Sequence, residues 1–170
     1  MTVLHARGAG YDLLLLGHVL VALVSLGAMV TAGGFALSLR RSSAAGAPAG
    51  EALVRYYRPG VNWAGRALFL VPVLGFALIG LSHGDWTLAD GWISAGLMLW
   101  VGVAVVAEGL LWPAERRLQE IVAQETRAPE PAALATAAPV PAALCTRVAV
   151  VSAALSMVLV AAAVVMVAKP

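Results

Sequence analysis

Four long apolar stretches divide the chain and predict its fold. They cover approximately residues 13–39, 61–81, 91–112 and 143–167. Each is long enough for a helix to cross a hydrocarbon core about 30 Å thick, which takes roughly 20 residues. The first stretch, LLLLGHVLVALVSLGAMVTAGGFALSL, has no charged residue, and a soluble helix seldom lacks a polar face over such a length. We therefore expect an all-α polytopic membrane protein, with four transmembrane helices in an antiparallel bundle that forms a single domain.

The segments between the stretches predict the rest of the organisation. Pro72 lies inside the second stretch and predicts a kink, with neighbouring helices satisfying the carbonyl that it leaves free. Pro113 follows the third stretch and predicts a break or a bend, and the amphipathic pattern of residues 114–125 predicts a short helix on the membrane surface. Residues 126–142 are rich in Pro and Ala and predict a flexible linker. The first twelve residues lack the pattern of a secretory signal, so we expect no cleavage.

Composition and charge agree with a membrane protein. Hydrophobic residues make up 61% of the chain and charged residues only 12%. Eleven basic and nine acidic residues give a net charge of +2, which is too balanced to indicate nucleic acid as a partner. The single cysteine, Cys145, cannot form an intramolecular disulfide.

The basic residues predict an orientation in the bacterial inner membrane. Nine of the eleven lie in or beside the first and third connections, and the middle connection has none. These nine are Arg40, Arg41, Arg55, Arg58, Arg66, Arg116, Arg117, Arg127 and Arg147. Because positively charged loops stay in the cytoplasm, we expect both termini and the loop of residues 82–90 to lie outside.

Three ionisable residues lie inside the predicted spans, namely His18, Arg66 and Glu108. At 1.5 Å per helical residue, Arg66 and Glu108 have similar depths near the inner side of adjacent antiparallel helices. We predict that they form an ion pair. We favour a structural bridge between the second and third spans over a proton or ion pathway.

His18 is a candidate ligand because of its place in the first span. Residues 18, 22, 25, 29 and 32 form a stripe of small or polar side chains, which we expect to face inward. Met98 in the third span lies at a similar depth, and His83, Asp85 and Asp90 lie in the outer loop. Imidazole and thioether groups bind copper and haem iron, so His18 with Met98 or His83 could hold a metal or haem near the outer face. The alternative is a structural histidine that bonds a group on a neighbouring helix.

The sequence carries no motif of a known enzyme class. No HxxxH, HExxH or CxxC spacing occurs, and no glycine-rich phosphate loop is present. Ser152 and Ser156 are spaced as a packing face of small residues rather than as a nucleophile with its base.

The segment GHVLVALVSLGAMV, and the later group Pro113, Arg116, Arg117 and Leu118, resemble a group of small four-helix bacterial membrane proteins. That group is similar to the membrane domain of copper-resistance D proteins and to the HemJ type of protoporphyrinogen oxidase. The resemblance covers approximately the first three spans. It implies a bundle with an early histidine, which is His18 here, and a connection to copper or haem.

Two function classes therefore stay open. The first is a non-enzymatic binding or transport protein that holds haem or a copper-type metal through His18. The second is an accessory subunit without a cofactor, which packs in a larger membrane complex or a homo-oligomer through the Ala, Ser and Val surface of the fourth span.

Overall fold

A computed structural model describes residues 8–127 and 140–168. Its described residues contain four helical stretches long and apolar enough to cross a membrane: Ala9–Ala44, Trp63–Leu81, Gly91–Arg127 and Ala142–Ala168. The expected all-α fold with four spans is thus confirmed, and the chain is a multi-pass membrane protein. Most of the predicted linker, residues 128–139, lies outside the described residues.

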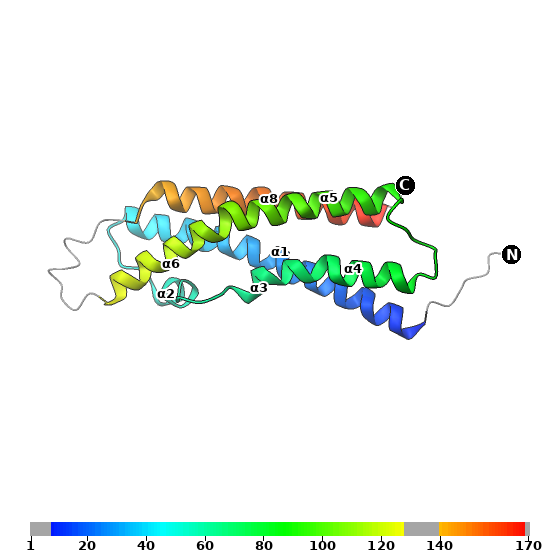
Figure 1. Ribbon diagram of the computed structural model, residues 1–170. Coiled ribbons are helices and arrows are strands. Elements are labelled where there is room, and N and C mark those ends of the chain that lie inside the picture. The colour runs from blue at the N-terminus through cyan, green and yellow to red at the C-terminus, as the bar shows by residue number, and fades with distance from the viewer. Residues whose placement is uncertain (1–7, 128–139, 169–170) are drawn as a thin grey trace.

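The bundle is built on its first and last helices (Figure 1). Helix α1 (Ala9–Ala44) packs along α8 (Ala142–Ala168); α5 (Gly91–Val106) packs on α8, and α4 (Leu70–Leu81) packs on α1. The end of the bundle where α1 begins and α8 ends is called the terminal end below. The opposite end carries Arg40, Arg41, Arg55 and Arg58, and is called the arginine-rich end.

Small side chains bring α1 and α8 close together. A Cβ at Gly33 would lie 3.1 Å from the Cβ of Ser152, so the two helices touch at this glycine. The predicted inward stripe of α1 is confirmed, because Ser25, Met29 and Ala32 are buried. Ser152 is buried as well. The small-residue face of α8, which we expected to meet a partner, is therefore used here to pack α1.

The second span changes its helical form around Pro72. It runs as α3 (Trp63–Arg66), a 3₁₀ turn (Ala67–Phe69) and then α4. Pro72 has no N–H to donate to the carbonyl of Leu68, four residues earlier. The indole Nε1 of Trp100 on α5 donates to that carbonyl at 2.9 Å. A neighbouring helix thus satisfies the carbonyl, as expected for a proline inside a membrane helix.

The third span continues past Pro113 without a break. We expected Pro113 to break or bend the chain before a further helix, and α5 continues through a π-helical turn (Ala107–Leu111) into α6 (Trp112–Arg127). Pro113 is the second residue of α6, where the wider π turn before it avoids the clash that a proline causes inside a regular α-helix. The apolar face of α6 packs on α8 and on the short helix α2 (Glu51–Tyr56). Helix α6 therefore extends the bundle.

The helices are longer than a bilayer is thick. With 36 residues, α1 is about 54 Å long, whereas the hydrocarbon core is about 30 Å thick. Large apolar side chains on the spans are exposed on the outside of the bundle, as Leu13, Val73 and Val105 illustrate. Lipid covers such side chains in a membrane. The excess length of α1 and α6, together with α2, forms an extension at the arginine-rich end (Figure 1).

Candidate functional site

A cavity of about 590 Å³ lies inside the terminal half of the bundle. Side chains from α1, α4, α5 and α8 line it, and almost all of them are apolar or aromatic. Three tryptophans, Trp86, Trp92 and Trp100, contribute to the wall. Among residues 8–127 and 140–168, no formally charged residue lines the cavity. An apolar cavity with few polar groups is the usual form of a small-molecule site.

His18 provides the most distinctive polar group of this cavity. Its ring is half-buried and lies against α4, where a Cβ at Gly75 would be 3.4 Å from the ring carbon Cε1. A glycine at position 75 thus makes room for the imidazole. The ring also faces the backbone of Val71, but its buried Nδ1 makes no hydrogen bond of ordinary geometry with a described residue. Buried polar atoms rarely lack a partner, so this nitrogen calls for an explanation.

The other two predicted ligands do not join His18. Met98 has the expected depth, but it points away from the bundle and is 71% exposed. His83 is exposed in the loop between α4 and α5, with a φ of 52°. No group of three or more His, Cys, Asp or Glu side chains that could hold a metal ion occurs among residues 8–127 and 140–168.

A different methionine lines the cavity with His18. Met166 on α8 lies directly over Gly96 of α5, so that a Cβ at position 96 would overlap its methyl group. Depth along a helix can be counted from the sequence, but the rotation of the helix about its axis cannot. We therefore expected Met98 in the place that the structure gives to Met166.

Arg66 and Glu108 meet near the middle of the bundle's length, as predicted from their similar depths. Arg66 Nη1 donates to Glu108 Oε1 at 2.5 Å, and the guanidinium carbon lies 3.9 Å from the centre of the Trp112 ring. The side chains are 29% and 46% exposed, so the pair lies at the surface of the bundle and not in its core. This arrangement supports a structural bridge between α3 and the π turn.

A buried carboxylate near this pair was not expected from the sequence. Glu115 on α6 is only 4% exposed, and its Oε1 accepts hydrogen bonds from Tyr56 at 2.8 Å and from Asn62 Nδ2 at 3.3 Å. Burial, and next the charge of Glu115, raise the pKa of the Tyr56 hydroxyl above its usual range. Tyr57 is also buried, but its hydroxyl has no partner among the described residues.

One sequence signal could have revealed this cluster. Glu115, Leu118 and Val122 recur at helical spacing, and all three are buried. A carboxylate on an apolar stripe requires polar partners. Those partners lie more than fifty residues away on α2 and before α3, so their identity could not be read from the local pattern.

Comparison of the chain with protein-family models, with curated proteins and with solved structures finds no match.

Proposed function

We propose that this protein binds a neutral, lipid-soluble molecule in the cavity, with His18 as its polar anchor. The observation that carries the proposal is the buried Nδ1 of His18, which lies beside an apolar cavity and, among the described residues, faces the backbone of Val71 without a hydrogen bond of ordinary geometry. A ligand carbonyl could accept a hydrogen bond from the protonated nitrogen, and a ligand hydroxyl could donate to the unprotonated one. The role is binding or transport rather than catalysis.

The lining of the cavity indicates the class of ligand. Since no charged residue in the described part of the chain lines the cavity, a charged ligand group would lose its hydration without compensation there. Aromatic walls favour a flat ring, and about 590 Å³ falls within the range of cavities that hold small organic molecules. A ring compound of quinone type, with an oxygen on the ring, meets these conditions.

A haem or copper-type metal is the second candidate, and Met166 is the observation that favours it. Its thioether lines the same cavity as the His18 imidazole, and these two groups are known ligands of haem iron and copper. The resemblance to copper-resistance D proteins and HemJ-type oxidases points the same way. In this version of the proposal Met166 replaces Met98 and His83 as the second ligand.

The proposal places the chain in a bacterial inner membrane, with the terminal end outside. The cavity would then lie in the outer half of the bilayer, and a ligand could enter it from the lipid. An accessory role in a larger membrane complex or a homo-oligomer, without any ligand, is the competing proposal.

Tryptophan fluorescence of the full-length protein in mild detergent tests these proposals. We expect a short-chain benzoquinone to quench the emission saturably, because three tryptophans line the cavity. His18→Ala should weaken this binding about tenfold, the effect of one lost hydrogen bond.

His83→Ala is the matched control, since this histidine is exposed and does not line the cavity. It should bind the quinone as the wild type does. A Soret band that His18→Ala or Met166→Leu removes would favour haem instead. Binding of neither probe, together with co-purifying membrane proteins, would favour the accessory role.

A further inference from the structure

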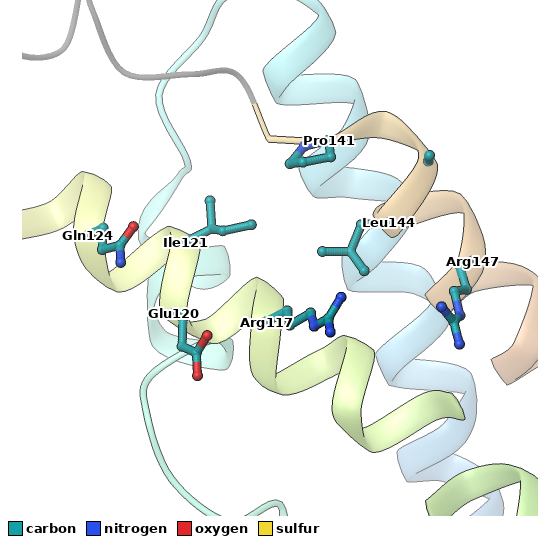
Figure 2. A pocket seen from close by; sticks show the side chains of 8 residues that line it. Arg117, Glu120, Ile121, Gln124, Pro141, Leu144 and Arg147 are labelled. Atoms are coloured by element: carbon teal, nitrogen blue, oxygen red, sulfur yellow. The ribbon is translucent and has the colours of Figure 1, made fainter. Parts of the chain in front are cut away.

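A groove between α6 and α8 at the arginine-rich end forms a second candidate site (Figure 2). Its volume is about 630 Å³, and it shares no lining residue with the cavity around His18. The groove combines basic, polar and apolar side chains. They are Arg117, Glu120, Ile121, Gln124, Pro141, Ala143, Leu144 and Arg147.

Two arginines give the groove its charge. Arg117 on α6 and Arg147 on α8 extend their guanidinium groups into the space between the helices (Figure 2). The ion pair found among the described residues joins Arg66 and Glu108, so neither of these arginines has an acidic partner there. The carboxylate of Glu120 points away from both guanidinium groups (Figure 2). The two positive charges are thus available to an anion.

The groove lies at the height of lipid headgroups. The apolar stretch of residues 91–112 ends five residues before Arg117, or about 7 Å along the helix. The headgroup layer extends about 5–7 Å beyond the hydrocarbon core on each side. A phosphate bound between the arginines would therefore lie at the level where phospholipids carry theirs.

An apolar path leads from the groove along α8. Val150 and Met157 follow Arg147 by three and ten residues and thus lie on the same face of the helix. They are 61% and 71% exposed. An acyl chain could follow this face while its headgroup occupies the groove. A free phosphate ion would gain nothing from these residues.

We propose that this groove binds the headgroup of an anionic phospholipid. Arg117 and Arg147 hold the phosphate, because the planar guanidinium pairs with phosphate oxygens through two parallel hydrogen bonds. Ile121 and Leu144 contact the glycerol region, and the acyl chains lie along α8. Basic pockets between membrane helices commonly bind such lipids. The site is independent of any ligand at His18.

Native mass spectrometry of the full-length protein, released from detergent micelles, tests the proposal. We expect phosphatidylglycerol to bind in preference to phosphatidylcholine with the same acyl chains. The double variant Arg117→Gln/Arg147→Gln should bind phosphatidylglycerol about tenfold more weakly. The matched control Arg116→Gln/Arg127→Gln removes the same charge from exposed residues of α6 outside the groove, and should bind as the wild type does.

A second variant keeps both arginines. Ala143→Glu places a negative charge in the groove at an exposed position in the first turn of α8, and it should also weaken binding of phosphatidylglycerol. If the arginine double variant loses its helical circular dichroism and is therefore unfolded, the binding of phosphatidylglycerol by Ala143→Glu tests the proposal instead. Equal binding of the two lipids would overturn the proposal, and so would an equal loss in the control variant. Displacement of the lipid by millimolar inorganic phosphate would show a site for free anions instead.

Discussion

At the scale of single residues, the buried polar atoms of this protein fall into two groups. Glu115 accepts hydrogen bonds from Tyr56 and Asn62, so its carboxylate is compensated inside the bundle. The Tyr57 hydroxyl, the Ser152 hydroxyl and His18 Nδ1 are buried without a hydrogen bond of ordinary geometry among the described residues. An unsatisfied buried polar atom costs stability. The proposed ligand would offset this cost at His18, whereas nothing in the structure explains it at Tyr57 or Ser152.

The two adjacent tyrosines allow a matched test of the Glu115 cluster. Tyr56→Phe removes a hydrogen bond to a buried carboxylate, and the free energy of unfolding should fall by about 1–3 kcal/mol. Tyr57→Phe removes a hydroxyl that has no partner, so its effect should stay within about 0.5 kcal/mol or be stabilising. Equilibrium unfolding in mixed detergent micelles measures the free energy of unfolding of both variants. Equal losses in the two variants would contradict the role given to Tyr56.

Contacts between residues were predicted correctly where they depended only on the depth of each residue along its helix. The heights of Arg66 and Glu108 on neighbouring helices predicted a contact that the structure contains. The same reasoning placed Met98 beside His18, but the rotation of α5 turns Met98 outward. Rotation depends on the packing of all neighbouring helices, and a nearly uniform apolar sequence contains little information about it.

At the scale of elements, both prolines are accommodated by local changes of helix type. A 3₁₀ turn comes before Pro72 and a π turn before Pro113. The sequence predicted the irregularity at Pro72 and the rescue of its free carbonyl. It predicted a break or a bend at Pro113, and the structure contains a continuous helix whose π turn before Pro113 relieves the clash of the proline ring. The apolar residues of α6 favour its continued packing on the bundle.

The hydrogen bond between Trp100 and the Leu68 carbonyl gives a prediction for the second span. Trp100→Phe should lower the free energy of unfolding by about 1–2 kcal/mol, because it removes the donor. The loss should be smaller in a Pro72→Ala background, since alanine supplies a backbone N–H for the same carbonyl. A double-mutant cycle measures this coupling. Additive losses would show that the indole and the proline act independently.

The crossing of α1 and α8 gives a second prediction at this scale. Gly33→Leu should destabilise the protein by about 2–3 kcal/mol, because the space beside Gly33 is filled by Ser152 and the backbone of Ala149. Gly34→Leu is the matched control, since nothing lies within 4 Å of a Cβ at that position. Its stability should stay unchanged or rise slightly. Similar unfolding free energies for the two variants would contradict the packing described here.

At the scale of the whole molecule, the four apolar stretches predicted the fold. The basic residues in the connections between these stretches predicted the orientation in the membrane. The cavity around His18 could not be predicted, because it depends on how four helices diverge at the terminal end. The groove between α6 and α8 also escaped prediction. Arg117 and Arg147 are thirty residues apart in the chain, and they line the same groove because α6 continues from α5 without a break.

Cysteine labelling tests the proposed orientation. In a Cys145→Ser background, Ala89→Cys and Ala45→Cys place a thiol at exposed positions on opposite ends of the bundle. An impermeant maleimide added to spheroplasts should label position 89 before lysis and position 45 only afterwards. Both positions are exposed, so a difference in labelling reports sidedness rather than burial. The reverse pattern would invert the proposed orientation.

The π turn at Ala107–Leu111 has a consequence for how this chain can change length. A π turn contains one residue more than the α-helical turn it replaces, and one residue corresponds to a rotation of about 100° around the axis. A π turn accommodates this residue by rotating less per residue, so deleting a single residue there would restore an ordinary α-helical turn and would leave Glu115 and Leu118 facing the interior. The helix can therefore be shortened by one residue at this turn without changing the phase of the sequence that follows it.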